Sequence, residues 1–165
     1  MHLGGRTRSH ADLDIGCFRN DLAVLRRDLG DWEFYAAIPG TLKRLGPEER
    51  PPAEANSLWC HSTGTEEWWL EILLDERDGP DWVFRRCRRV KWPTATLALR
   101  SPGRMPYLRP EIQLLYKAKA SRAKDDADFE RLLPALSGKQ LSWLGSALET
   151  WEPGHRWIPR LRRAV

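Results

Sequence analysis

Residues 57–75 read SLWCHSTGTEEWWLEILLD, and they specify the centre of the fold. Two runs rich in aromatic and aliphatic residues, Ser57–Ser62 and Glu67–Asp75, are separated by the short segment Thr63-Gly64-Thr65. Aromatic and branched residues favour strands, and a short connection that contains glycine favours a hairpin. We therefore predict a β-hairpin whose second strand is central and well buried.

Three elements precede this hairpin. We predict a strand at Asp12–Phe18, a helix at Asp21–Leu29 and a second strand at Trp32–Ile38. Asn20 is suited to cap the helix, because its short side chain can accept a hydrogen bond from the first turn. Gly30 supplies the stop signal that commonly ends a helix.

After the hairpin, the spacing of apolar residues changes from one typical of strands to one typical of helices. We predict one more, rather exposed strand at Trp82–Val90 and a loop at Arg100–Arg109. Pro110 and Glu111 then open a helix that runs to about Ala120, because proline suits the first helical position and glutamate favours the positive helix end. The second half of the chain is thus predicted to be helical.

Two further helices follow. The first is indicated by Phe129, Leu132, Leu133 and Leu136, which recur at helical spacing. The second opens at Ser137-Gly138-Lys139-Gln140, which has the pattern of a capping box, and Pro153-Gly154 ends it.

Length and composition indicate one globular domain. The chain has 165 residues, of which 41% are hydrophobic and 30% charged, and its formal net charge is +4. Those fractions are typical of a soluble domain with a core of its own. We expect a single domain over residues 1–165 of the α/β (α+β) class, with a small mixed β-sheet in residues 1–99 and a mainly helical segment in residues 110–165.

Neither disulfides nor a membrane segment are predicted. Cys17, Cys60 and Cys87 are widely separated and odd in number, which favours a reducing compartment over a disulfide framework or a zinc site. The longest apolar run, Trp68–Leu74, is interrupted by Glu71, and the first ten residues lack the apolar core of a signal peptide. We expect a cytoplasmic location.

Two aspartates are the first candidates for a functional site. Asp12 and Asp14 are two apart, so on a strand they project from one face, where their oxygens suit a hard cation such as Mg²⁺. Glu71 interrupts an apolar strand, where a charge is costly unless it is paired or bound to metal. Solvated carboxylates at a strand end, or on the open face of a half-buried strand, are the alternative. Asp75 is the reserve candidate.

Basic side chains flank these carboxylates in the sequence. Arg8 and His10 precede Asp12 and offer donors for the oxygens of a nucleoside triphosphate. Lys117 lies on the predicted helix 110–120, where it can neutralise a phosphate if it faces the sheet, or else snorkel at the surface.

Other chemistry-bearing residues receive simpler interpretations. His61 and Cys60 lack further ligands at metal spacing and are interpreted as packing and surface residues. The chain has nine Trp, and Trp68 and Trp69 alternate along a predicted strand, which favours core packing over a base-stacking platform. The basic run 85–91 would suit nucleic acid, but on a strand Arg85 and Arg86 would point to opposite faces.

Two sequence runs carry a family resemblance. Residues 6–14, RTRSHADLD, closely resemble the Thr-Arg-x-His-x-Asp-x-Asp signature of aminoglycoside and lincosamide nucleotidyltransferases, small members of the polymerase-beta-like nucleotidyltransferase superfamily. The later run Lys117…Arg122-x-Lys124-Asp125-x-x-Asp128-Phe129 resembles the helical Lys…Arg-x-Lys-Asp-x-x-Asp segment of many minimal members. The matches come in the right order, cover most of the chain, and are specific for the superfamily and suggestive for its antibiotic-modifying branch.

The resemblance implies a fold and a reaction. It implies a nucleotidyltransferase core in which Asp12, Asp14 and Glu71 are catalytic and bind Mg²⁺, while Arg8, His10 and Lys117 contact the nucleotide. The reaction would transfer a nucleoside monophosphate, AMP from ATP, to a hydroxyl of a small molecule such as an aminoglycoside-like antibiotic, with pyrophosphate leaving. Such transfer depends chiefly on positioning and charge neutralisation.

One feature departs from the family pattern. In the family, a Gly-Gly or Gly-Ser turn lies ten or more residues before the aspartates and cradles the phosphates with backbone N–H groups. Gly4-Gly5 lies too close to Asp12 to be that turn. We therefore expect Met1 to correspond to an internal position of a longer ancestor, so that the chain is truncated relative to the family.

Two alternatives remain open at this point. A catalytically degenerate nucleotidyltransferase fold would act as a binding or regulatory module, and the missing glycine turn favours it. A nucleic-acid-binding domain built on residues 85–91 would show steep salt dependence without a need for magnesium. We expect an enzyme that acts on a nucleoside triphosphate and a small hydroxylated acceptor, with neither nucleic acid nor membrane as a partner.

Overall fold

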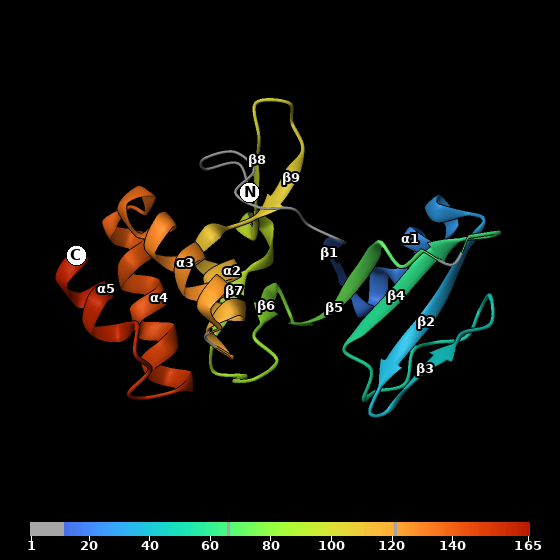
Figure 1. The fold of residues 1–165 in the computed structure, drawn as a ribbon, viewed down its shortest axis with the longest axis horizontal. Coiled ribbons are helices and arrows are strands. Elements are labelled where there is room, and N and C mark those ends of the chain that lie inside the picture. Colours follow the sequence, from blue (N-terminus) through green and yellow to red (C-terminus); the bar gives the residue numbers. More distant parts are fainter. Residues whose placement is uncertain (1–11, 66, 121) are drawn as a thin grey trace. The chain divides into compact units, whose positions relative to one another are not determined.

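The computed structural model describes residues 12–65, 67–120 and 122–165 (Figure 1). These residues form two compact units, one within residues 8–77 and one within residues 78–165. The fold is α+β, with a mixed sheet followed by a C-terminal set of helices, as the sequence predicts. That the whole chain acts as one domain stays a prediction.

Five strands of the mixed sheet belong to the N-terminal unit, in the order β3-β2-β4-β5 with β1 also paired to β5. Neighbouring strands pair antiparallel except β1, which runs parallel to β5. The strands are β1 (Leu13–Phe18), β2 (Trp32–Ile38), β3 (Thr41–Arg44), β4 (Ser57–Ser62) and β5 (Leu70–Asp78). The predicted central position of the second hairpin strand is confirmed, because β5 has β4 on one side and β1 on the other.

One face of this sheet holds the core of the unit. Helix α1 (Leu22–Leu29) packs against it (Figure 1). Leu22, Leu25 and Leu29 of this helix pack against the apolar side chains of the strands. Ile72 at the centre of β5 is fully buried there. The buried strand residues on this face are Phe34, Ala36, Leu58, Cys60, Leu70, Ile72 and Leu74. Because side chains alternate along a strand, the residues between them point to the opposite, open face.

Several boundaries in this unit differ from the sequence prediction. Asn20 does not cap α1, because Arg19–Asp21 forms a short 3-10 helix that runs directly into it. Gly30 ends the helix as predicted, with φ +45°. Strand β5 begins at Leu70 rather than Glu67, and the hairpin of β2 with β3 extends the sheet beyond the predicted elements.

The C-terminal unit combines two short strand pairs with four helices. Strands β6 (Asp81–Val83) and β7 (Lys91–Pro93) pair antiparallel, as do β8 (Ala98–Arg100) and β9 (Pro106–Leu108). The helices are α2 (Pro110–Ala118), α3 (Ala123–Leu132), α4 (Gly138–Trp151) and α5 (Ile158–Ala164). No helix in the described part of the chain is long and apolar enough to cross a membrane.

Local signals locate the helices well and the short strands poorly. Ser137 and Gln140 form the predicted capping box of α4, and Pro110 is the first residue of α2. The predicted strand Trp82–Val90 is wrong after Val83, and the predicted loop 100–109 contains parts of the β8–β9 hairpin. Helix α5 follows the predicted stop at Pro153-Gly154.

Aromatic packing forms much of the core of the C-terminal unit. Phe129 of α3 stacks on Trp157, with ring centroids 4.3 Å apart and planes inclined by 7°. Phe84 is fully buried and lies edge-on to Tyr116 of α2 and Trp151 of α4. These contacts join residues that are distant in the sequence, and aromatic pairs of this kind add to the free energy of burial.

Candidate functional site

The three predicted metal ligands come together on the open face of the N-terminal sheet. Asp14 on β1 lies directly opposite Glu71 on β5, and Asp12 precedes β1. Each residue places a carboxylate oxygen within 4.8 Å of an oxygen of the other two. Asp12 and Asp14 are exposed, whereas Glu71 is half-buried. The parallel pairing of β1 with β5 therefore creates the cluster that the sequence suggests.

The surroundings of Glu71 disfavour its ionisation. Burial raises the pKa of its carboxyl, and the charges of Asp14 and Asp12 raise it further, while a hydrogen bond with Ser57 of β4 opposes the shift. Three converging carboxylates repel one another unless a cation lies between them. An all-oxygen donor set of this kind suits Mg²⁺, so the residues present fit the predicted ion.

Asp75 lies on the same face of β5 but outside this cluster. Its Oδ2 lies 3.3 Å from the point where a Cβ on Gly16 would stand. Asp75 also acts on the thiol of Cys17, whose pKa rises to about 11 through burial and the charges of Asp21 and Asp75. Among the described residues, Glu71 and not Asp75 therefore completes the set with Asp12 and Asp14.

The predicted nucleotide ligands have different outcomes. Arg8 and His10 lie outside the described residues, so their roles stay predictions. Lys117 of α2 belongs to the C-terminal unit, where its Nζ lies 2.8 Å from Asp128 and 3.7 Å from Asp125 of α3. The lysine therefore links two helices, and its contact with a triphosphate stays a prediction.

The same helical motif contains a buried ion-pair network. Asp125 is fully buried, and its carboxylate accepts a hydrogen bond of 2.8 Å from Arg122. Burial opposes ionisation of Asp125, but the hydrogen bond and the charges of Arg122 and Lys117 outweigh it and lower the pKa of this carboxyl. Four of the residues that carry the family resemblance thus bind one another: Lys117, Arg122, Asp125 and Asp128.

The predicted burial of two tryptophans is wrong. Trp68 and Trp69 precede β5, and their exposed fractions are 38% and 42%. Trp68 instead borders a hollow of about 650 Å³ on the open face, together with Tyr35 and His61. His61 lines this hollow and is itself buried, and Cys60 is buried as predicted, so that burial raises the pKa of its thiol to about 12. This hollow is not among the sites that the sequence predicts.

The alternation of side chains along β2 and β4 indicates which residues can line this hollow. Glu33 and Tyr35 are two apart on β2, and His61 lies directly opposite Glu33 on β4. All three side chains therefore point to the open face, which is the face that carries Asp14 and Glu71.

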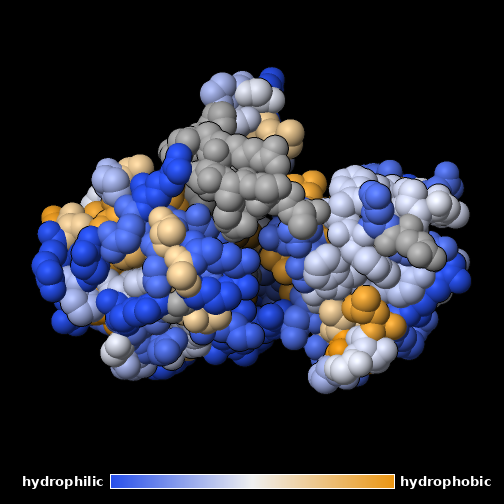
Figure 2. Space-filling view, viewed as in Figure 1, coloured by the Kyte–Doolittle hydropathy of each residue, from blue (hydrophilic) through white to orange (hydrophobic). Residues whose placement is uncertain are grey.

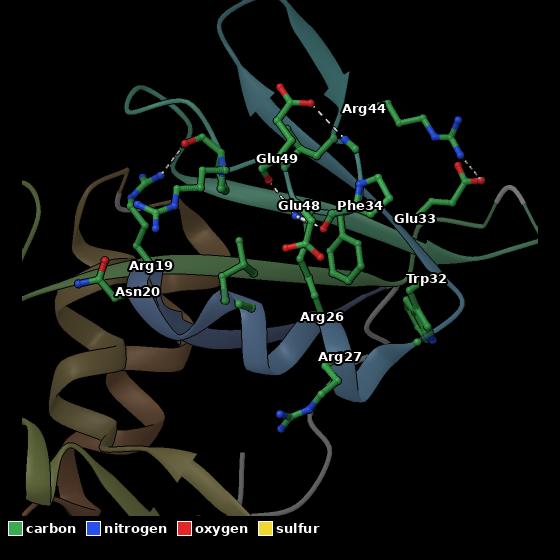
Figure 3. Close-up of a pocket in the computed structure, with 18 residues that line it drawn as sticks. Arg19, Asn20, Arg26, Arg27, Trp32, Glu33, Phe34, Arg44, Glu48 and Glu49 are labelled. Carbon is green, nitrogen blue, oxygen red and sulfur yellow. Dashed lines mark hydrogen bonds and ion pairs between the residues drawn. The ribbon is translucent and has the colours of Figure 1, made fainter.

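A larger hollow of about 1150 Å³ lies beside α1 and residues 46–51 (Figure 3). Its arginines hold the loop in place. Arg19 donates a hydrogen bond of 2.6 Å to the carbonyl oxygen of Ala55, and Arg26 donates one of 2.8 Å to that of Glu49. We therefore assign these two arginines a structural role.

The basic run 85–91 does not form the predicted strand. The backbone N–H of Cys87 donates a hydrogen bond to the carbonyl oxygen of Phe84, and that of Val90 donates one to the carbonyl oxygen of Cys87. The chain therefore makes two successive turns. The argument that Arg85 and Arg86 point to opposite strand faces is therefore wrong. Arg86 lies over the rings of three aromatic residues, Phe84, Tyr116 and Trp151.

Positive charge is concentrated in the C-terminal unit. Residues 78–165 contain 18 Lys and Arg against 9 Asp and Glu. Figure 2 shows a mainly hydrophilic surface over helices α3, α4 and α5. Several of these cations are paired; Arg160, for example, lies 2.6 Å from Glu130, and Arg162 lies 2.7 Å from Glu149.

Comparison with known proteins gives no family assignment: no protein-family model matches the chain, and no curated protein sequence matches it significantly. The sequence motifs and the geometry of the open face therefore remain the only indications of function among the described residues.

Proposed function

We propose that this protein is a magnesium-dependent nucleotidyltransferase that moves AMP from ATP to a hydroxyl group of a small molecule, such as an aminoglycoside-like antibiotic. The observation that carries the proposal is the convergence of Asp12, Asp14 and Glu71 on one accessible sheet face. The order of these residues in the nucleotidyltransferase signature supports the same assignment.

Each carboxylate has a role in this proposal. Asp12 and Asp14 hold magnesium, which when bound neutralises the charge of the phosphate groups during displacement at phosphorus. Glu71 either completes the ligand set or accepts the proton of the acceptor hydroxyl, as a carboxylate beside the two aspartates can do. The acceptor oxygen forms a bond to the α-phosphorus as the bond from that phosphorus to pyrophosphate breaks.

The alternative is a degenerate nucleotidyltransferase fold that binds a ligand without transfer. One observation favours it: Lys117, which the resemblance assigns to the triphosphate, already contacts Asp125 and Asp128.

Calorimetric titration with a non-hydrolysable ATP analogue tests the proposal. We expect binding to require magnesium and Asp14→Asn to weaken it by about tenfold or more, a typical loss when a metal site is disturbed. Asp75→Asn is a matched control, because it removes a carboxylate from the same sheet face outside the cluster. Equal magnesium-dependent binding by wild type and Asp14→Asn would contradict the metal assignment.

A transfer assay then separates the enzyme from the binding module. Pyrophosphate release from ATP is measured with a panel of hydroxylated acceptors, for wild type, Asp12→Asn and Asp14→Asn. An enzyme gives magnesium-dependent release that both variants abolish. Magnesium-dependent binding without release from any acceptor favours the degenerate fold.

A further inference from the structure

The hollow beside Trp68 has the size and lining of a small-molecule site. Its volume of about 650 Å³ falls within the range of roughly 300–1,000 Å³ that is usual for ligand sites. It is lined by Glu33, Tyr35, His61, Gly64, Thr65 and Trp68. Such sites combine aromatic walls with a few polar groups that fix orientation, and this lining contains both.

Three rings form the apolar part of the lining. Tyr35 and His61 are stacked, with centroids 5.4 Å apart. Trp68 lies edge-on to both, at 5.0 Å from Tyr35 and 4.8 Å from His61. Since the Trp68 side chain is 38% exposed, part of its indole surface remains available to a planar ligand. Stacking on an aromatic side chain suits a nucleobase, because every base has a π-face.

The polar part of the lining accepts hydrogen bonds. Glu33 Oε2 accepts from Tyr35 Oη at 2.7 Å, and Glu33 Oε1 accepts from Arg44 at 2.9 Å. These interactions, the Tyr35 hydrogen bond first, lower the pKa of Glu33 and keep it ionised. An ionised carboxylate has about four acceptor positions, so Glu33 can accept further hydrogen bonds from a ligand.

His61 adds a second acceptor. Its Nδ1 lies 3.1 Å from the carbonyl oxygen of Ser62. A carbonyl oxygen only accepts, so the tautomer with its hydrogen on Nδ1 fits this contact, and that tautomer presents Nε2 as an acceptor. Nε2 lies 4.0 Å from Glu33 Oε2, beyond hydrogen-bond length. The ligand that fits these groups is a planar ring that donates hydrogen bonds.

The hollow lies close to the carboxylate cluster on the same face. Glu71 lies opposite Trp59, and Trp59 lies opposite Tyr35. Two strand spacings therefore separate Glu71 from Tyr35, about 9–10 Å between their backbones. The backbone N–H of Leu13, which lies between Asp12 and Asp14, donates a hydrogen bond of 2.7 Å to the carbonyl oxygen of Trp69, which follows Trp68. A nucleotide can span this separation from its base to its α-phosphate.

We propose that this hollow binds the base of the nucleotide and selects an amino-bearing purine such as adenine. The ring stacks on Trp68, and its exocyclic amino group donates to Glu33. The inference rests on the proposed function for the identity of the ligand. It goes beyond that function by assigning a base site, outside the catalytic carboxylates, to residues that the sequence motifs do not include.

Binding of nucleosides to the full chain without metal tests the base site directly. Adenosine and purine riboside form a matched pair, since they differ only in the exocyclic amino group. We expect wild type to bind adenosine about tenfold more tightly than purine riboside, because purine riboside has no amino group to donate a hydrogen bond to Glu33. Glu33→Gln should reduce this preference severalfold. Equal affinity of wild type for the two nucleosides would overturn the role of Glu33.

The stacking role is tested with a pair of tryptophan variants. Trp68→Ala should weaken adenosine binding by about tenfold or more, and Trp68→Phe should restore most of it. Trp69→Ala is the matched control, because Trp69 is similarly exposed but lies edge-on to Trp32 and outside the hollow. Adenosine affinity that is equal in wild type and Trp68→Ala, with both folded by circular dichroism, would overturn the inference.

The failure of the base site and the failure of the enzyme can be distinguished. Adenosine has no phosphate, so Asp14→Asn should leave its binding unchanged. Trp68-dependent adenosine binding without transfer activity would support the base site and refute the enzyme. Transfer in which Trp68→Ala raises KM for the acceptor, and not for ATP, would show that the hollow holds the acceptor and would overturn the base assignment.

Discussion

Asp14 lies directly opposite Glu71 across the parallel pairing of β1 with β5, and the two side chains project from the same face of the sheet. Burial raises the pKa of the Glu71 carboxyl, and the charge of the facing Asp14 raises it further. This relationship makes the cluster sensitive to pH and to cations in ways that can be measured.

We expect Glu71→Gln to stabilise the metal-free protein at pH 7, by no more than about 1 kcal/mol because the site is partly exposed. The folded pKa of Glu71 lies above its ordinary value of 4.5, so its contribution to stability is complete below pH 4.5. That contribution is lost as the pH rises through the folded pKa. Urea unfolding of both proteins between pH 4 and 7 should show the advantage of the variant growing with pH, and a constant difference would argue against this coupling.

The buried network around Asp125 predicts the opposite dependence on pH. Asp125→Ala should cost about 2 kcal/mol at pH 7, because it removes charge-assisted hydrogen bonds from Arg122, while Lys117 keeps its closer partner Asp128. Since the folded pKa lies below the ordinary value of 3.8, the stability that ionised Asp125 provides is present above pH 3.8 and is lost as the pH falls through the folded pKa. Denaturant unfolding at pH 7 and near pH 3 should show a smaller deficit in acid.

A surface ion pair provides the control for this prediction. Glu130 and Arg160 lie 2.6 Å apart, and both side chains are half-exposed. Glu130→Ala should cost less than about 1 kcal/mol at either pH. A loss at Glu130 as large as that at Asp125 would show that burial does not govern the strength of these pairs.

Two glycines should respond in opposite directions to replacement by alanine. Gly30 ends α1 with φ +45°, which side chains rarely adopt, so Gly30→Ala should destabilise the protein by about 1 kcal/mol. Gly145 lies within α4, and an added Cβ there meets no atom within 4 Å. Gly145→Ala should stabilise by about 0.5–1 kcal/mol. Thermal unfolding of the two variants measures both effects, and a destabilising Gly145→Ala would be inconsistent with regular helix at that position.

Gln140 joins the starts of two helices. Its Oε1 accepts a 2.9 Å hydrogen bond from the Ser137 backbone, and its Nε2 donates one of 2.8 Å to Glu111, which is fully buried on α2. Gln140→Ala should therefore cost about 2–3 kcal/mol, because it removes part of the cap and a partner of a buried carboxylate. Ser137→Ala, which affects the cap alone, should cost about 1 kcal/mol, and equal losses in urea unfolding would contradict the role of the Glu111 contact.

Where local signals agree with the packing, the sequence predicts the elements closely. The bounds of β2 and β4 match the prediction, because each run of strand-forming residues is bordered by turn residues. The same reasoning fails at residues 84–90, where apolar and basic residues look like a strand. Backbone hydrogen bonds fold that segment into turns, and Phe84 is drawn into an aromatic core that no local pattern records.

The candidate site likewise has one part that the sequence predicts and another that only the tertiary structure determines. Spacing alone predicts Asp12 and Asp14 on one strand face, because side chains alternate with a period of two, although β1 begins only at Leu13. The position of Asp14 opposite Glu71 depends on the register between β1 and β5, two strands that are distant in the sequence. A shift of this register by one residue would place the two carboxylates on opposite faces of the sheet. Likewise Tyr35, His61 and Trp68 come from three separate segments, and only the packing of β2, β4 and the approach to β5 brings their rings together.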